Sequence, residues 1–436
     1  MNNINNVVRT LNTKDKIFLK YLYRMRCLSK QQVYELFYKN MCTPEGFDIF
    51  RIKPYLSLDV LRLEYSSTGV ETLFLGQTGI DIVRSIYNIP AEVHDSYLNK
   101  KINNKRTVGD LNMNPRLIDH QLNLNSFVLK FSARFAKTHP SEKFNYSDEK
   151  FLSRLQIIRP DGMISYKNIQ LFLEMDMGTE SKRQLLEKFN KYRLFLTDRE
   201  RHPDNKKIVV LFITKIDADK MEQRKNLIRS SAEEVFTSYI KDDFEIYIGN
   251  DKELLNACFN KILPIEDNKY EVDDILIKKL LKNKHGFSIT RGNAIQMSLG
   301  GAAYGYYIRQ KINNTNIIRK VGNTCQEFLL DEYTYAPFSV ILKIINAQSA
   351  SYAFNAAYNR EINYVVVVSD IKTIYEHLKC LNLFDTPTVF YTTPTRLNKL
   401  PFYKALFKLD INGNIFSPID ETYTKLKAEE QTVFDL

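Results

Sequence analysis

The sequence lacks the cysteine pairs that a zinc ribbon or a disulfide scaffold needs. Its 436 residues include five cysteines, and no two of them form a CxxC pair. An odd number of scattered thiols is typical of a reducing compartment. The sequence therefore predicts a cytoplasmic protein whose cysteines are free, namely Cys27, Cys42, Cys258, Cys325 and Cys380.

Long apolar runs and nucleotide-binding motifs are absent as well. Residues 1–12 are polar and carry no apolar segment of signal-peptide type, and no run reaches the roughly 20 residues that span a bilayer. There is no P-loop, which argues against ATP-driven helicase work. A cluster of histidines with an upstream tyrosine, the usual relaxase pattern, is also missing. The 26 tyrosines nevertheless leave a covalent tyrosyl mechanism open.

Acidic residues are outnumbered by basic ones, which gives a net charge of +11 and a pI near 9.1. An excess of this size favours a polyanionic partner such as DNA or RNA. The alternative is that the many Lys, Asn and Ile residues reflect an AT-rich genome. Hydrophobic residues make up 44% of the chain, so it can bury real cores, and its length predicts about three domains.

Residues 1–90 have the order of a winged helix-turn-helix. An apolar helix comes first, and Ser29 opens the next one with Gln32 three residues later, which is a capping box. A third helix is expected from Pro44 to Lys53, and we expect it to stop before Pro54 because proline disfavours helix at the preceding residue.

Two extended runs follow these helices, at 60–65 and 70–75, and the turn composition at 66–69 predicts a hairpin between them. This hairpin would be the wing, and Thr78 is expected to cap a closing helix. In such modules the third helix enters the major groove and the wing contacts the backbone. The sequence therefore predicts a DNA-binding module at the N-terminus.

Three basic residues are the candidates for contact with DNA. Arg51 and Lys53 lie on the expected third helix, and Arg62 lies on the first strand of the expected wing. Winged helices also serve as plain protein-interaction modules, and a helix shortened by Pro54 argues against strong sequence specificity. Both roles stay open from the sequence alone.

The next segment, 91–114, is polar and basic and is interpreted as a linker. It is either exposed to solvent or lies against the phosphates of a nucleic acid. A helix is expected from Pro115, and it carries His120. A lone histidine on a helix is more often structural than functional. We expect residues 115–265 to form one α/β domain that begins with this helix.

Three acids mark the centre of that domain. Asp161 lies in a Pro-Asp-Gly sequence, where regular strand pairing is interrupted. The strand expected at 171–177 is apolar apart from Glu174 and Asp176, whose i, i+2 spacing puts them on one side. Carboxylates that converge from neighbouring strands form a hard oxygen site that suits Mg²⁺ or Mn²⁺.

A helix is expected after Gly178, with Thr179 as its N-cap, and Lys188 could point back toward the strand acids. Three acids and a lysine are what a metal-dependent phosphodiesterase uses. The acids hold the metal, and the lysine neutralises the phosphate. The alternative is that the paired acids are a solvated strand face and that Pro-Asp-Gly is an ordinary turn.

The stretch resembles the core of the replication-relaxation family of plasmid proteins. That family has a Pro-Asp element, a Glu-x-Asp strand followed by Gly-Thr-Glu, and a helix with Lys and Tyr four apart. The resemblance implies a winged helix before a core similar to the PD-(D/E)xK nuclease fold. Asp176 stands where that nuclease pattern has Lys, so the lysine role would pass to the helix. The matching residues are Asp161, Glu174, Asp176, Gly178, Thr179, Glu180, Lys188 and Tyr192.

The remainder, 270–436, contains no motif with a known role. A hairpin is expected between 306–309 and 317–321, followed by a strand at 339–344, a helix at 351–358 and a strand–helix–strand unit. This order resembles the first core after Leu171, yet the 339–344 run carries no acid. A degenerate repeat of the core and convergence on a common α/β order are equally compatible with it.

Taken together, these features predict a mixed α/β protein that binds double-stranded DNA, such as a plasmid origin, in plasmid replication or conjugative relaxation. Other replication or relaxosome proteins are further expected partners, and a membrane is not. Two alternatives remain open: an active Mg²⁺- or Mn²⁺-dependent endonuclease of nicking or restriction type, and a non-catalytic DNA-binding scaffold or regulator. They differ in whether Asp161, Glu174, Asp176 and Lys188 converge.

Overall fold

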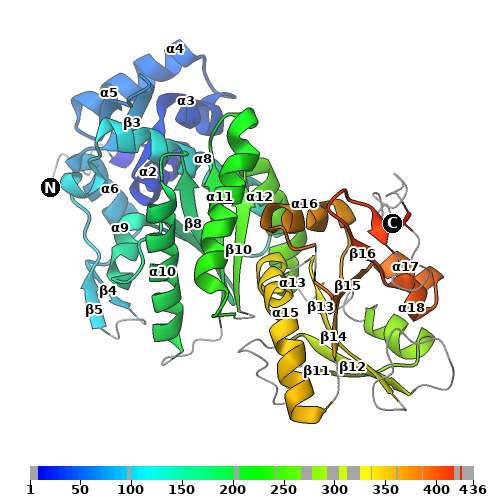
Figure 1. Ribbon diagram of the computed structural model, residues 1–436. Helices are drawn as coiled ribbons and strands as arrows, with labels where there is room; N and C mark the ends of the chain where they lie inside the picture. Colours follow the sequence, from blue (N-terminus) through cyan, green and yellow to red (C-terminus); the bar gives the residue numbers. More distant parts are fainter. Residues whose placement is uncertain are drawn as a thin grey trace. The chain divides into compact units, whose positions relative to one another are not determined.

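The chain is a mixed α/β protein with several sheets (Figure 1). Within the described residues, no helix is long and apolar enough to cross a membrane. The computed structural model describes residues 8–95, 100–200, 206–240, 243–266, 277–291, 304–311, 325–334, 336–359, 362–384, 386–416 and 423–424.

The chain divides into two compact units, and each is described by itself. The first comprises Met1–Tyr166, Gln170–Met177 and Phe212–Lys215, and the second comprises Lys167–Ile169, Gly178–Leu211 and Ile216–Leu436. The domain boundaries expected from the sequence stay predictions.

The first unit begins with short helices around a three-stranded antiparallel sheet of order β1-β3-β2. The expected capping box at Ser29 is confirmed, because its hydroxyl accepts the Gln32 N–H at 3.0 Å while the Gln32 side chain accepts the Ser29 N–H at 2.9 Å. The elements are α2 (Thr13–Met25), β1 (Cys27–Ser29), α3 (Lys30–Val33), α4 (Pro44–Phe47), α5 (Lys53–Ser57), β2 (Leu61–Tyr65), β3 (Glu71–Leu75) and α6 (Gln77–Ile86), with π-helical turns at Tyr34–Tyr38 and Asp48–Ile52.

The third helical segment does not stop before Pro54 as expected, and it continues to Ser57. The widened turn at Asp48–Ile52 precedes the proline, and the Lys53 N–H bonds back to the Asp48 carbonyl. Because that turn already departs from the regular i to i−4 pattern, the missing N–H of proline is tolerated there.

Thr78 is not the cap of α6, since the helix begins at Gln77 with Gly76 in the N-cap position. A carboxylate distant in the sequence supplies the cap: Asp59 Oδ2 accepts the Gln77 N–H at 3.0 Å. A Cβ at Gly76 would lie 2.2 Å from the Asp59 carbonyl oxygen, so only glycine allows this close approach.

The segment 91–114 carries regular structure that the sequence did not predict. Strands β4 (Glu92–Asp95) and β5 (Lys100–Asn103) pair antiparallel, and α7 (Val108–Leu111) follows. Arg106 leaves this segment to form two hydrogen bonds with Asp148, at 2.7 and 2.8 Å. The Asp148 side chain has no solvent exposure, so the guanidinium compensates for a fully buried charge.

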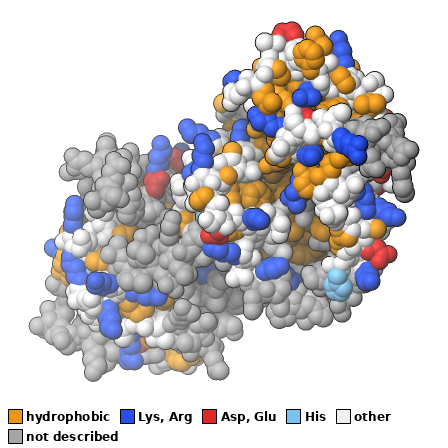
Figure 2. All heavy atoms as spheres, turned by 180° about the vertical axis from the view of Figure 1, so that it is seen from behind, with side chains coloured by type: hydrophobic (Ala, Val, Ile, Leu, Met, Phe, Trp, Pro, Cys, Tyr) orange, Lys and Arg blue, Asp and Glu red, His pale blue; other side chains and the backbone are white. Residues whose placement is uncertain are grey.

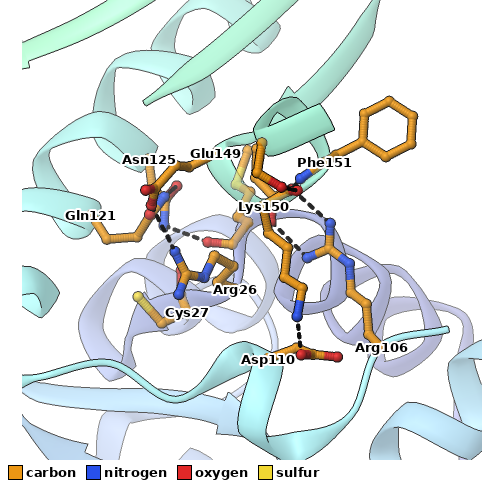
Figure 3. A network of polar contacts seen from close by, with 12 residues as sticks. Arg26, Cys27, Arg106, Asp110, Gln121, Asn125, Glu149, Lys150 and Phe151 are labelled. Atoms are coloured by element: carbon orange, nitrogen blue, oxygen red, sulfur yellow. Dashed lines mark hydrogen bonds and ion pairs between the residues drawn. The ribbon is translucent and has the colours of Figure 1, made fainter. Parts of the chain in front are cut away.

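Helix α8 (Pro115–Thr138) joins the N-terminal elements to the rest of the first unit. Its Asn125 side chain donates to the carbonyls of Met25 and Cys27, at 3.1 and 2.6 Å. Figure 3 shows Asn125 and Cys27 near Arg26 and Glu149, which form an ion pair, and near Arg106, whose partner is Asp148. The N-terminal helices are therefore held by buried polar contacts to residues about a hundred positions away.

Removing the guanidinium at Arg106 is expected to destabilise the first unit. Arg106→Met leaves Asp148 buried without its cation, which costs about 3 kcal/mol in the free energy of unfolding. Denaturant unfolding measures the loss. Arg116→Met is the matched control because Arg116 is exposed on α8. Equal stability of the two variants would contradict the expectation.

The first large sheet has the strand order β10-β9-β8-β7-β6. Its strands at 207–214 and 244–249 are separated along the chain by a helix, and the helix expected after Gly178 is capped by Ser181 rather than Thr179. The elements are β6 (Asn145–Asp148), α9 (Glu149–Leu152), β7 (Gly162–Tyr166), β8 (Ile169–Asp176), α10 (Lys182–Arg199), β9 (Lys207–Thr214), α11 (Ala218–Phe236), β10 (Phe244–Gly249), α12 (Asp251–Ala257) and α13 (Leu263–Glu266).

The second large sheet has the order β11-β12-β13-β14-β15, antiparallel through β13 and parallel from there on. Helix α15 packs against β14 (Figure 1). The elements are β11 (Ser288–Arg291), β12 (Tyr306–Lys311), β13 (Cys325–Glu332), α15 (Pro337–Tyr358), β14 (Asn363–Val367), α16 (Ile371–Leu381), β15 (Val389–Thr392), α17 (Pro394–Lys399), α18 (Phe402–Ala405), β16 (Lys408–Leu409), β17 (Ile415–Phe416) and β18 (Tyr423–Thr424).

The strand expected at 339–344 is wrong, because those residues lie inside α15. An apolar run of this length does not distinguish a buried strand from a buried helix. The cap comes from another element: Glu245 on β10 accepts the backbone N–H groups of Phe338 at 3.0 Å and Ser339 at 3.4 Å. Of the expected hairpin, 306–309 lies in β12, and 317–321 lies outside the described residues.

Candidate carboxylate site

Strand β8 carries the two acids at the centre of the candidate site. Glu174 is 3% exposed and Asp176 is 2% exposed, so the pair is not a solvated strand face. Because successive side chains of a strand point to opposite faces, residues two positions apart lie on the same side. Burial of two carboxylates on one side of a strand is costly unless charge or hydrogen bonds compensate for it. The C-terminal end of β8 is therefore a candidate functional site.

Asp161 is fixed to the same strand at two points. Its backbone N–H donates to the Leu173 carbonyl at 3.0 Å, and its Oδ2 accepts the Met175 N–H at 2.7 Å. The side chain keeps 22% exposure. Asp161 is therefore held next to β8 between the positions that precede and follow Glu174, while one of its oxygens is bound by the backbone.

His120 approaches this acid from α8. Its Nε2 lies 3.3 Å from Asp161 Oδ2 and 3.1 Å from the Met175 carbonyl oxygen, so the proton is on Nε2. Burial opposes the charged form, but the hydrogen bond and charge of Asp161, the Met175 carbonyl and the charge of Glu174 outweigh it. The pKa of His120 is therefore raised above its ordinary value. From the sequence, His120 was a lone histidine on an expected helix, for which a structural role is more common than a functional one.

The described residues contain no group of three or more His, Cys, Asp or Glu side chains that could hold a metal ion. Mg²⁺ is often bound by one or two carboxylates together with water and substrate phosphate, so the oxygen donors of Asp161, Glu174 and Asp176 remain chemically suited to it. The metal site stays a prediction.

Lys188 lies on α10, in the second unit. Its Nζ is 2.8 Å from Glu180 Oε1, and both side chains are about a quarter exposed, at 26% and 28%. Glu180 belongs to the Gly-Thr-Glu sequence, so the structure brings together two of the motif residues. A phosphate-binding role for Lys188 stays a prediction.

The three candidate DNA-contacting residues differ in their surroundings. Arg51 Nε lies 3.6 Å from Oδ1 of the fully buried Asp15. Arg62 donates to Asn112 Oδ1 at 2.5 Å and pairs with Glu64 at 3.6 Å. Lys53 is exposed at the start of α5. Lys53 is therefore the best placed of the three to reach a phosphate.

Two surface features were not evident from the sequence. The turn at 66–69 is bound to α8, since Ser67 and Thr68 donate to the two oxygens of Asp119, with Thr68 at 2.6 Å. The third helical segment exposes apolar side chains, with Ile49 at 52% and Phe50 at 70%. Basic side chains are spread over the face in Figure 2 rather than gathered in one band.

The fold and the site define a mixed α/β protein with a buried acid pair on a strand of its first large sheet. Residues 19–211, a little under half of the chain, match the family model described as Replication-relaxation. The resemblance noted in the sequence is confirmed over that range. No curated protein and no solved structure matches the chain.

The pair of His120 and Asp161 is expected to make stability depend on pH. Because the folded-state pKa of His120 is raised above 6.5, its contribution is complete below that pH and is lost as the pH rises through the folded value. Thermal melts of wild type and His120→Gln between about pH 5.5 and about pH 9 measure this. The difference in Tm should be largest at the acid end, and a difference independent of pH would exclude the ion pair.

Proposed function

We propose that this protein binds double-stranded DNA in plasmid replication or conjugative relaxation. Residues 1–90 form a winged helix-turn-helix in this proposal, and residues 115–265 form a PD-(D/E)xK-like core. The family match over residues 19–211 carries the proposal, because it includes both the N-terminal helices with their hairpin and the acids Asp161, Glu174 and Asp176.

Three observations support DNA binding. Capped short helices precede an antiparallel hairpin, which is the order of a winged module. Lys53 is exposed on the third helical segment. The net charge of +11 provides the long-range attraction that phosphate binding requires. The exposed Ile49 and Phe50 favour a protein partner as the second role of this same helix.

Lys53→Ala should weaken binding of the full chain to every duplex sequence, by about fivefold at physiological salt. One lost phosphate contact lowers the slope of log affinity against log salt by about one. Titration of a labelled plasmid-origin duplex and of an unrelated duplex at several salt concentrations measures both quantities.

Lys252→Ala is the matched control, because Lys252 is exposed on α12 in the second unit. An unchanged salt slope in Lys53→Ala would remove Lys53 from the interface. Loss on the origin duplex alone would mean that Lys53 reads bases instead of phosphate.

A metal-dependent endonuclease is the second candidate function. The observation that favours it is the arrangement around β8: Asp161 is held by the Met175 N–H beside the buried Glu174, and His120 donates to it. Asp161, Glu174 and Asp176 would hold Mg²⁺ or Mn²⁺, which would supply positive charge and an activated water. The role proposed for Lys188 is to bind the scissile phosphate.

Glu174→Gln removes one charge at nearly constant shape. If the core cuts DNA, wild type should convert supercoiled plasmid to the nicked form with Mn²⁺, and the variant should lose at least about a hundredfold in rate while staying folded. Glu187→Gln, an exposed position on α10, is the control. Absence of nicking in wild type, with DNA binding retained, would instead support a non-catalytic scaffold or regulator.

A further inference from the structure

The two large sheets have the same plan. In the first, the order β10-β9-β8-β7-β6 places α10 between β8 and β9 along the chain and α11 between β9 and β10. In the second, the order β15-β14-β13-β12-β11 places α15 between β13 and β14 and α16 between β14 and β15. Strand β13 is therefore the counterpart of the acid-bearing β8, and α15 is the counterpart of α10.

The sequence spacing agrees with this correspondence. Helix α10 begins six residues after Asp176, and α15 begins six residues after Asp331. Lys188 follows Asp176 by twelve residues, and Lys343 follows Asp331 by twelve. The aspartate at the end of the strand and the lysine in the second turn of the helix therefore recur together at one constant offset.

In the second unit this aspartate and lysine meet. Lys343 Nζ lies 2.9 Å from Asp331 Oδ1, and the two residues are only 2% and 7% exposed. The Gly305 N–H donates to the same oxygen at 2.9 Å, and the Tyr364 hydroxyl donates to Oδ2 at 3.2 Å. A Cβ at Gly305 would lie 2.9 Å from Oδ1, so the absence of a side chain there allows the contact.

The second unit lacks the other acid of the motif. Leu329, which is buried, stands two residues before Asp331, where the first sheet has Glu174 two residues before Asp176. Tyr304 lies beside the pair, with Lys343 Nζ 5.8 Å from its ring, and its buried hydroxyl has no hydrogen-bond partner among the described residues. One carboxylate with one ammonium is charge-balanced, and Leu329 supplies no anionic ligand for a divalent cation at the position of the second motif acid.

We infer that the C-terminal α/β unit is a second copy of the acid-bearing core, in which the ammonium of Lys343 takes the place of a metal ion beside Asp331. In this copy an internal ion pair occupies the end of β13, and the copy binds no divalent cation. Any metal chemistry in the chain is then confined to the first sheet. The statement that Lys343 replaces a metal ion rests on the proposed nuclease-like core, whereas the correspondence between the two sheets does not.

Full-chain thermal melts with and without Mn²⁺ test the inference, using Lys343→Met, Asp331→Asn and the double variant. Each single change should lower Tm by about 5 °C or more, because it leaves a buried group uncompensated, and the double variant should lose less than the sum. Mn²⁺ should restore part of the Tm of Lys343→Met, where the carboxylate lacks its cation, and none in the double variant.

Strictly additive losses would overturn the buried ion pair. If Mn²⁺ raises the Tm of Lys343→Met no more than that of the double variant, Lys343 does not take the place of a metal ion. The same conclusion follows if Lys343→Met stays unfolded with Mn²⁺ while the double variant folds. All variants are measured in a Glu174→Gln background, which weakens the proposed metal site of the first sheet equally in every variant. The proposed metal site in the first sheet is tested separately in wild type. If that site does not exist, Mn²⁺ leaves the Tm of wild type unchanged.

Discussion

The structure depends on cations and hydrogen-bond donors that offset the cost of burying carboxylates away from water. A buried carboxylate is stable only with a cation or several hydrogen-bond donors beside it. Asp148 has the guanidinium of Arg106, Asp161 has the Met175 N–H and His120, and Asp331 has Lys343. The partners in these pairs lie between 12 and 42 positions apart in the sequence. The polar contacts therefore fix which elements lie together, while apolar packing supplies most of the stability.

The same requirement distinguishes the two sheets. Compensation at Asp331 is complete and internal, since an ammonium, an N–H and a hydroxyl contact its two oxygens. Asp161 keeps partial exposure, and its neighbour His120 has a raised pKa because of the negative charge around it. The metal site that we propose lies at this end of β8, whereas the pair of Asp331 and Lys343 is already neutral. Two copies of one plan can thus differ in chemistry through a single substituted acid, Glu174 against Leu329.

The N-terminal elements and the acid-bearing strand were predictable because their signals are local. A capping box needs only Ser29 and Gln32, and an i, i+2 acid pair on an apolar strand needs only 171–177. The errors arose where a distant group decided the outcome. Asp59, in the turn between α5 and β2, caps α6, and Glu245 on β10 caps α15, whose apolar residues suit a strand equally well. Arg106 was assigned to a linker because nothing local indicates its partner Asp148.

By itself the sequence determined the mixed α/β class, the positions of most strands, the acids of β8 and the family resemblance, because each depends on short-range pattern and residue type. Only the tertiary structure decided that Lys343 neutralises Asp331, that Arg51 and Arg62 lie against acceptors while Lys53 is exposed, and that the counterpart of β8 is β13. The physical reason is that compensation of buried charge acts through space. The arrangement of the sheets and helices is what brings together residues twelve to a hundred positions apart.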